Sequence, residues 1–376
     1  MTLCVFVLIA SEFMPVSLLT PMAADLQVTE GMAGQGIAIS GVFAVLTSLS
    51  ISWVARTLDR KTLLLALAGL MAVSGVIVGL APDYQTYMVG RALIGVVIGG
   101  FWSMSAATAM RLVPAPKVSK ALAIFNGGNA LATVVAAPLG SYLGSIIGWR
   151  GAFFCVVPVA AIALVWMYIS LPPMKVEPRT AGGGNVFKLL KNRSVALGMA
   201  GCAAFFMGQF ALFTYLRPFL ETVTRVDVST LSLILLVIGA AGFVGTLIIS
   251  RFLKRSLFRT LIAIAVLMAL IALALIPFGN SIIVVTALLG LWGLLATAAP
   301  VGWWSWLAQA LPNDAEAGGG LMVAVIQLAI ALGSTVGGLL FDNRGYQSTF
   351  VASAVVLLLG AVITVLTSRS TPSRTA

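Results

Sequence analysis

Residues 260–313 read TLIAIAVLMALIALALIPFGNSIIVVTALLGLWGLLATAAPVGWWSWLAQALPN and contain no Asp, Glu, Lys or Arg. A membrane-spanning helix needs about 20 apolar residues, so this stretch is long enough for two spans. The turn-forming residues 277–280, Pro-Phe-Gly-Asn, divide it near its middle. The stretch therefore predicts two transmembrane helices joined by a short turn.

The same pattern extends over the rest of the chain. Of its 376 residues, 60% are hydrophobic and only 9% are charged, whereas a soluble domain is about 25% charged. Uncharged runs mark spans, because a charge at mid-bilayer costs roughly 2.5 to 3.5 kcal/mol. One span begins at Met1, and the stretch 260–313 supplies two more. The other runs cover residues 31–55, 62–82, 92–110, 121–149, 151–174, 194–216, 228–250, 317–341 and 345–368. We predict an all-α membrane protein of twelve helices.

The charges between the runs predict the orientation. Seventeen Lys and Arg residues lie in one alternating set of loops and ends, and four lie in the other, namely Arg150, Arg217, Arg225 and Arg344. The positive-inside rule then places both termini in the cytoplasm, as expected in a bacterial inner membrane. The first run has no basic leader and contains Glu12, so we expect a retained span and not a cleaved signal peptide.

Composition also argues against several function classes. The net charge of +11 comes from residues scattered in short loops, whereas nucleic-acid binding needs basic residues clustered on one face. The chain has no histidine and only three separated cysteines, Cys4, Cys155 and Cys202, which excludes zinc sites, disulfide frameworks and His-based catalysis. We therefore expect no enzyme and no cofactor, but a monomer in the lipid bilayer acting on a small-molecule substrate.

Two related halves are visible in the sequence. Glu12-Phe13 with Pro21 recurs as Gln209-Phe210 with Pro218 at an offset of 197, and residues 100–103, Gly-Phe-Trp-Ser, recur as Gly-Trp-Trp-Ser at 302–305. The predicted domains are an N-terminal six-helix bundle at 1–171, a cytoplasmic linker at 172–194, a C-terminal six-helix bundle at 195–367 and a cytoplasmic tail at 368–376. Parallel repeats of this kind place a substrate site between the halves at mid-membrane.

Glu12 is a carboxylate about halfway along the first span. Apolar surroundings favour the neutral form of a carboxyl group, and ionisable groups inside a membrane are functional by default. The counterpart Gln209 has a similar shape but cannot titrate. The pair predicts proton coupling in the N-terminal half. In the alternative, Glu12 pairs with a cation and only holds helices together.

Arg91 lies inside the fourth span and cannot lose its charge. Arg91, Gly95, Ile98 and Trp102 follow helical spacing on one face, which predicts a cation along a cavity wall and a coupling role beside Glu12. Two offsetting charges would leave the cavity nearly neutral, which disfavours phosphorylated substrates. The alternative is an arginine that snorkels to the outer headgroups.

Aromatic and amide side chains are the predicted substrate-binding groups. Phe205, Gln209 and Phe213 are spaced i, i+4, i+8, and an amide between two rings suits a flat polar heterocycle. The remaining members of the set are Phe13, Trp102, Asn126, Asn129, Trp303 and Gln327, with Trp304 beside them. Helix packing and interfacial anchoring are the competing interpretation for each of them.

Two further motifs concern helix geometry and gating. Gly128, Pro138 and Gly140 lie in one span, where such residues indicate close helix contact and a kink. Asp59 and Arg60, followed by Lys61, lie in the loop before the third span. They predict a cytoplasmic gate of charge pairs, although a merely solvated loop fits equally well.

These residues resemble the major facilitator superfamily, in its branch of drug and metabolite proton antiporters. Arg91 with Gly95 and Gly99 resembles the fourth-helix motif of that superfamily, and Gly128, Pro138 and Gly140 resemble the motif of its antiporter helix. The resemblance implies two pseudo-symmetric six-helix bundles and proton coupling through the helix that carries Arg91.

Longer segments resemble bacterial purine ribonucleoside efflux pumps. They are EFMPVSLLTPMAADL at 12–26, GGFWSMSA at 99–106 and FTYLRPF at 213–219. The resemblance implies proton-driven export of nucleosides such as inosine and guanosine by alternating access. Efflux of sugars or amphipathic drugs is the alternative with the same fold. A non-transporting membrane receptor or scaffold is the alternative from a different class.

Overall fold

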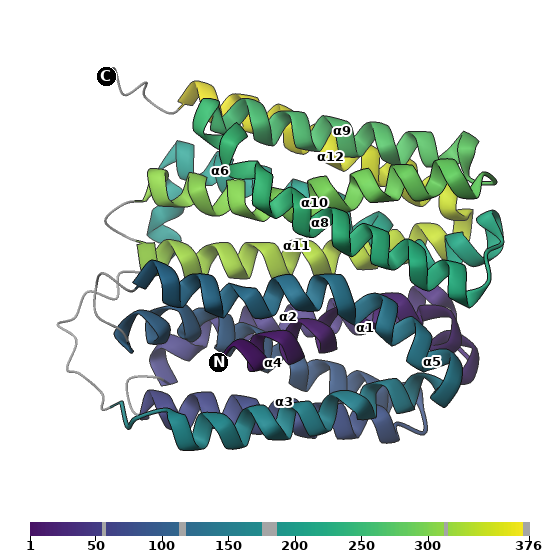
Figure 1. Ribbon diagram of the computed structural model, residues 1–376. Helices are drawn as coiled ribbons and strands as arrows, with labels where there is room; N and C mark the ends of the chain where they lie inside the picture. The colour runs from purple at the N-terminus through teal and green to yellow at the C-terminus, as the bar shows by residue number, and fades with distance from the viewer. Residues whose placement is uncertain (55–57, 113–117, 175–185, 312–314, 371–376) are drawn as a thin grey trace. The chain divides into compact units, whose positions relative to one another are not determined.

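A computed structural model describes residues 1–54, 58–112, 118–174, 186–311 and 315–370 (Figure 1). In these residues the secondary structure is helical, and eleven helices are long and apolar enough to cross a membrane. The chain is a multi-pass membrane protein, and the prediction of an all-α membrane fold is confirmed.

The N-terminal helices are α1 (Thr2–Asp25), α2 (Glu30–Val54), α3 (Arg60–Leu80), α4 (Tyr84–Arg111) and α5 (Val118–Ser170). The first four match predicted spans. The predicted spans 121–149 and 151–174 correspond to the two parts of α5, which meet at the non-helical Gly148.

Gly148 explains how α5 contains two spans. Its backbone angles are φ 74° and ψ 164°, which are not helical, and glycine adopts a positive φ without steric cost. A straight helix of 53 residues would extend about 80 Å, far beyond the roughly 30 Å of the hydrocarbon core. The bend at Gly148 therefore lets α5 cross twice, which restores the twelve predicted crossings.

The C-terminal helices begin after a short 3-10 helix, η2 (Val186–Lys191). They are α6 (Arg193–Phe213), α7 (Leu216–Phe219), the π-helical turn η3 (Leu220–Thr224), α8 (Val228–Arg255), α9 (Leu257–Phe278), α10 (Ile282–Ala310), α11 (Ala315–Arg344) and α12 (Tyr346–Ser370). The uncharged stretch 260–313 does form two helices, and their boundary lies at 279–281 as its turn residues predicted.

The chain forms two compact units. Unit 1 comprises residues 1–180 and 227–236, and unit 2 comprises 181–226 and 237–376. In unit 1, α1 packs on α5, α2 packs on α4, and α3 lies against both α4 and α5. In unit 2, α6 packs on α11 and α12, and α9 packs on α10 and α12, as the neighbouring ribbons in Figure 1 show.

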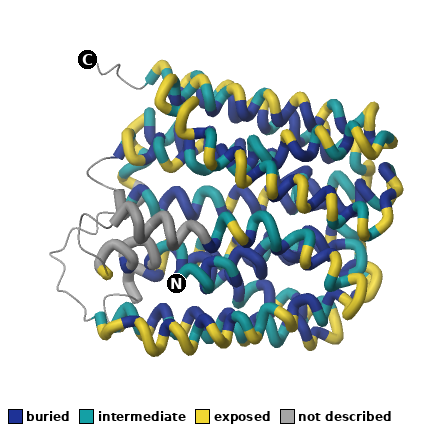
Figure 2. Tube along the Cα trace, in the orientation of Figure 1, coloured by how far each residue is buried: buried dark blue, intermediate teal, exposed yellow. Residues whose placement is uncertain are grey.

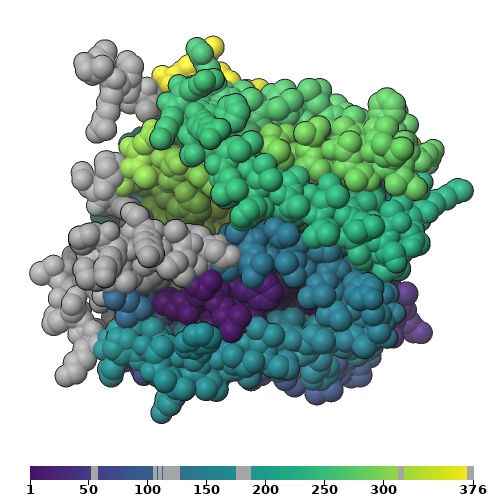
Figure 3. All heavy atoms as spheres, in the orientation of Figure 1, coloured from purple at the N-terminus to yellow at the C-terminus, as the bar shows by residue number. Residues whose placement is uncertain are grey.

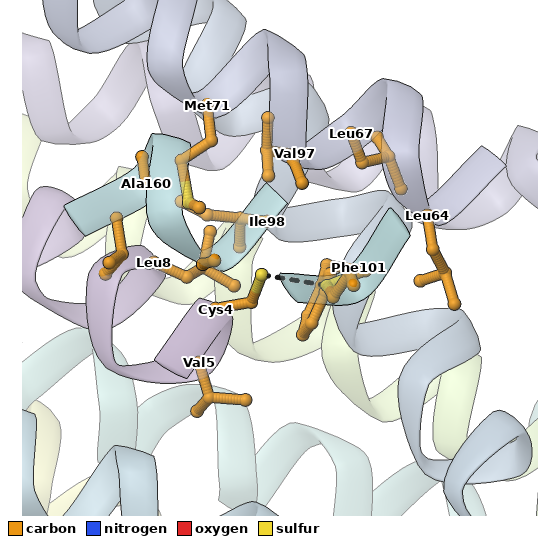
Figure 4. Close-up of a cluster of buried hydrophobic side chains, with 14 of the residues drawn as sticks. Cys4, Val5, Leu8, Leu64, Leu67, Met71, Val97, Ile98, Phe101 and Ala160 are labelled. Carbon is orange, nitrogen blue, oxygen red and sulfur yellow. Dashed lines mark hydrogen bonds between the residues drawn. The ribbon is translucent and has the colours of Figure 1, made fainter. Parts of the chain in front are cut away.

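The core of unit 1 is apolar where α1, α3, α4 and α5 meet. Cys4, Leu8, Met71 and Ile98 are among its buried side chains and point toward one another in Figure 4. The Cys4 thiol donates a hydrogen bond to the Met167 sulfur at 3.0 Å. In this core α1 is buried over the residues that precede Glu12.

Large apolar side chains also face outward along the helices. Ile283 is 83% exposed and Ile169 is 76% exposed, and exposed positions recur along the outer faces of α9 and α12 in Figure 2. Figure 3 shows side chains of α8 and α9 at the surface of the molecule. An apolar exterior is expected of a protein whose solvent is lipid.

Candidate functional site

Arg91 is the centre of a buried polar cluster in unit 1. It lies on α4 and is only 1% exposed. Its Nε donates to the Gly36 carbonyl at 3.0 Å and its Nη1 to the Ser11 carbonyl at 2.6 Å. Its Nη2 donates to the Glu12 carbonyl at 3.2 Å and to the Ser40 hydroxyl at 3.3 Å. The guanidinium therefore joins α4 to both α1 and α2, and the snorkelling alternative was wrong.

Pro15 explains why the Ser11 carbonyl is available to Arg91. In a helix this carbonyl would accept the N–H of the residue four positions later. That residue is Pro15, which has no N–H. The proline frees a buried acceptor on α1, and the shortest hydrogen bond of Arg91 satisfies it.

Glycines bring α2 close enough for Arg91 to reach it. A Cβ atom added at Gly95 would lie 2.3 Å from the Ser40 carbonyl oxygen, and one at Gly99 would lie 2.2 Å from that of Ala44. Only glycine permits so close an approach of two backbones. The Ser40 hydroxyl also donates to the Ile37 carbonyl at 2.8 Å, which orients its oxygen to accept from Arg91.

Glu12 lies on α1, directly beside this cluster. The residue is 3% exposed, and its main-chain carbonyl is one of the acceptors of Arg91. The structure thus brings together the two intramembrane charges that the sequence singled out. Arg91 binds the α1 backbone at Ser11 and Glu12, which sequence spacing did not predict.

The predicted antiporter-helix residues hold α5 against α1. A Cβ atom at Gly128 would lie 2.2 Å from the Thr2 carbonyl oxygen, and one at Gly140 would lie 2.9 Å from the Ser17 hydroxyl oxygen. Pro138 is half-buried between these glycines inside α5. These contacts place the small residues of α5 along the helix that carries Glu12.

Gln209 lies on α6 of unit 2, at the position that corresponds to Glu12. Part of its side chain is accessible, but its Oε1 atom is buried and has no hydrogen-bond partner among the described residues. Phe205 is 2% exposed and meets Phe206 edge-on at 5.5 Å, while Phe213 meets Phe210 edge-on at 6.0 Å. On α6 the amide is therefore flanked by a phenylalanine one turn before it and another one turn after it.

The tryptophans of α10 have different environments. Trp303 is 2% exposed, packs edge-on against Trp306 at 6.0 Å and has an Nε1 donor with no partner in the described part of the chain. Trp304 is 42% exposed. The indole N–H of Trp292, also on α10, is likewise buried and unbonded. Sequence reasoning did not single out Trp292, because an indole in an apolar run gives no signal of an unpaired donor.

The other predicted substrate residues are spread over both units. Phe13 and Trp102 are partly buried against the apolar core of unit 1. Asn129 is partly buried on α5, and its carbonyl accepts from Thr133 at 2.9 Å. Gln327 is 6% exposed on α11. The side chain of Asn126 lies outside the described residues.

The charged loop before α3 serves the helix that follows. The Asp59 carboxylate accepts from the Lys61 N–H at 2.7 Å and from the Thr62 N–H at 3.3 Å, so it is the N-cap of α3. Lys61 lies 5.4 Å from the Tyr168 ring centre, and Arg60 is half-buried. Capping explains the presence of Asp59. The cytoplasmic gate stays a prediction.

A second polar cluster joins the end of α1 to α5 and to the residue after α3. The Asp25 carboxylate accepts from Trp149 Nε1 at 3.0 Å and pairs with Arg150. Arg150 Nε donates to the Ala81 carbonyl at 2.8 Å. Nearby, the Asp83 carboxylate caps α4 by accepting the Thr86 N–H at 2.8 Å. This backbone hydrogen bond holds the pKa of Asp83 below its usual value.

Unit 2 repeats one close helix contact of unit 1 without the arginine beside it. A Cβ atom at Gly293 would lie 2.2 Å from the Ile238 carbonyl oxygen, which reproduces the Gly95–Ser40 contact at an offset of 198. At this offset Leu289, fully buried, replaces Arg91. The predicted match of residues 100–103 with 302–305 is therefore displaced by four residues, or one helical turn.

Comparisons with known proteins agree with this architecture. The sequence matches the family description "Major Facilitator Superfamily" over residues 1–324. The chain belongs to the major facilitator superfamily. It is therefore a membrane transporter and not an enzyme, as the sequence predicted.

Relatives of this major facilitator superfamily member carry different names. The "Transcription regulatory protein OpdE" of Pseudomonas aeruginosa is 67% identical over 370 residues, which cover 98% of this chain and 92% of that protein. The "Purine ribonucleoside efflux pump NepI" of Salmonella typhimurium is 42% identical over 369 residues, covering 98% and 93%.

Among solved structures, a bacterial homologue of the human lysosomal transporter Spinster, inward-facing and unoccupied, superimposes with a TM-score of 0.78. The two chains are 16% identical, and the match covers 98% of this chain and 95% of the other. This similarity supports the major facilitator fold alone.

Proposed function

We propose that the protein is a proton-coupled antiporter that exports purine ribonucleosides, such as inosine and guanosine, by alternating access. The observation that carries the proposal is the binding of the buried Arg91 guanidinium to the α1 backbone at Glu12. A carboxyl group buried beside a fixed cation is suited to exchange one proton. The 42% identity to a protein named as a purine ribonucleoside efflux pump supports the substrate class.

In the proposed cycle, Glu12 receives a proton from the periplasm when the substrate leaves and loses it to the cytoplasm when the next substrate binds. Exchange follows if the proton and the substrate exclude one another. One proton moving across about 150 mV releases roughly 3.5 kcal/mol, enough to hold a neutral substrate against a gradient of a few hundred-fold. Arg91 keeps its charge throughout and stabilises the deprotonated carboxylate.

The proposal also includes the setting of the protein. We place it in the bacterial inner membrane with both termini in the cytoplasm, because Lys and Arg are concentrated in one set of loops. We propose that it works as a monomer, with the proton as its coupling ion and without a cofactor.

Flux measurements in proteoliposomes test this function. With an imposed pH gradient, the wild-type protein should drive radiolabelled inosine uphill, and Glu12→Gln should not. Asp342→Asn is the matched control, because it neutralises an exposed carboxylate at the end of α11. Uphill transport by Glu12→Gln at the wild-type rate would refute the coupling role of Glu12.

The cargo can be separated from the mechanism by competition. Unlabelled nucleosides should reduce labelled inosine flux, whereas sugars and amphipathic cations should leave it unchanged. Competition by sugars or drugs in place of nucleosides would keep the antiport mechanism and replace the substrate.

A regulatory role is the second candidate, because the 67% identical relative is named a transcription regulatory protein. Export of a small effector would change its cytoplasmic level and so alter gene expression indirectly. Comparing transcripts in cells with wild-type protein and with Glu12→Gln distinguishes the two roles. A transport-dependent effect disappears in the variant, whereas a receptor-like effect persists.

A further inference from the structure

The amide of Gln209 has an acceptor that the described residues do not satisfy. Its Oε1 atom is buried, and no donor of the described residues reaches it. Unmade hydrogen bonds at buried acceptors are destabilising, so native proteins rarely keep them without a function. The Arg91 cluster differs, because its guanidinium donates hydrogen bonds to four acceptors on α1 and α2. Gln209 therefore requires a donor from elsewhere.

The surroundings of Gln209 restrict what that donor can be. Phe205 lies one turn before it and Phe213 one turn after it on α6, and each ring packs against a further phenylalanine. The single charged residue of α6, Arg193, stands at the far end of the helix. A charged donor would lose its hydration here, and α6 offers it no acidic counter-ion. A neutral N–H or O–H group on a flat, stackable ring fits better.

This inference rests on the proposed function, which supplies purine ribonucleosides as substrates. We infer that Gln209 reads the Watson–Crick edge of a 6-oxopurine base, with Oε1 accepting the N1–H and the amide nitrogen donating to O6. A primary amide presents one acceptor and one donor side by side. The lactam edge of hypoxanthine or guanine presents the complementary donor and acceptor. Proteins read unpaired bases by such edge contacts combined with stacking.

A prediction about substrate chemistry follows. Methylation of N1 replaces the donor with a methyl group, so 1-methylinosine should bind at least about tenfold more weakly than inosine. Sites built around a specific hydrogen bond reject analogues that lack the group, because the buried partner is left unpaired. If Oε1 instead accepts from a ribose hydroxyl, both nucleosides should bind equally.

The experiment measures competition against radiolabelled inosine in proteoliposomes, with unlabelled inosine and 1-methylinosine as the two probes. The variants are Gln209→Leu and the control Gln347→Leu, which removes an exposed amide on α12 of the same unit. Wild type and Gln347→Leu should prefer inosine by about tenfold or more. Gln209→Leu should bind inosine about tenfold more weakly and should lose the preference.

The possible results are distinct. Equal competition by both nucleosides in the wild type overturns the inference without any variant, and so does a preference that survives in Gln209→Leu. In both cases inosine transport persists and the proposed function stands. Absence of inosine transport by the wild-type protein overturns the proposed function itself and the inference with it.

Discussion

The helix pairs α2–α4 and α8–α10 share a packing device but differ in chemistry. Gly95 lies against the Ser40 carbonyl and Gly293 against the Ile238 carbonyl, and an added Cβ would meet these oxygens at 2.3 and 2.2 Å. One turn before the glycine, unit 1 has Arg91 and unit 2 has Leu289. The duplicated scaffold has kept the close backbone contact, and only one copy uses it to hold a charge.

The difference between the units extends to α1 and α6, which correspond to each other. Glu12 and Pro15 of α1 correspond to Gln209 and Leu212 of α6 at an offset of 197. The proline that frees a carbonyl and the arginine that binds it are both absent from unit 2. At the position of Glu12, unit 2 has Gln209, whose Oε1 atom has no hydrogen-bond partner in the described part of the chain. We therefore propose that unit 1 serves proton coupling and unit 2 serves substrate recognition.

The largest expected effect comes from giving unit 1 the residue of unit 2. Arg91→Leu should abolish pH-driven transport and lower the free energy of unfolding by about 3 kcal/mol, because buried acceptors on α1 and α2 lose their donor. Flux assays and SDS titration measure the two effects. The control is Arg369→Leu, at an exposed arginine near the end of α12. Normal coupled transport by Arg91→Leu would show that the charge held by unit 1 is not needed for coupling.

The shared packing predicts equal effects in the two units. Gly95→Ala and Gly293→Ala should each destabilise the protein by about 2 kcal/mol, because each new methyl group overlaps a backbone oxygen. Thermal unfolding in detergent measures this. The controls are Gly69→Ala and Gly320→Ala, where an added Cβ has no neighbour within 4 Å. A large effect in only one unit would contradict the equivalence of the two contacts.

A smaller effect is expected at Pro15. Pro15→Leu restores the N–H that can bind the Ser11 carbonyl, so it competes with Arg91 for this acceptor. The substitution should be destabilising in the wild type and less so, or stabilising, in the Arg91→Leu background. A double-mutant cycle should give a coupling free energy of about 1 kcal/mol. Additive effects of the two substitutions would rule out the shared carbonyl.

The smallest effect concerns the N-cap residues of α4 and α10. Asp83 caps α4, whereas its counterpart Ser281 makes no side-chain cap hydrogen bond to α10. The pKa of Asp83 is lowered on folding, so its contribution is present above its usual pKa of 3.8 and is lost as the pH falls through the lower folded value. Asp83→Ser should slightly reduce the melting temperature at pH 7, and Ser281→Asp should slightly raise it. Both differences should shrink below about pH 4, and differences independent of pH would exclude capping by the carboxylate.

Sequence patterns were sufficient for the spans, the duplication and the two intramembrane charges, because a charge inside an apolar run is conspicuous. They did not predict the contact between Arg91 and the Ser11 carbonyl. That contact depends on which faces of α1 and α4 meet, and helical spacing along one chain segment does not determine this. The role of Pro15 could have been recognised from its position four residues after Ser11, once an acceptor for Arg91 was sought.

Two other sequence interpretations depend on local geometry. Asp59 caps α3, and its role in a gate stays a prediction. The recurrence of Gly-x-Trp-Ser suggested an offset of 202, whereas the glycine contacts place the true offset at 198. Residues four apart lie on the same face of a helix. A shift of four residues therefore leaves the repeated pattern on that face, and the sequence alone does not reveal the shift in offset.

The central claim is that proton exchange resides in unit 1 at Glu12. The most direct test measures protons released when inosine binds to the purified protein in weakly buffered detergent solution near neutral pH. The account predicts about one proton released per bound inosine in the wild type, none in Glu12→Gln and unchanged release in Asp342→Asn. Proton release by Glu12→Gln equal to that of the wild type would contradict it.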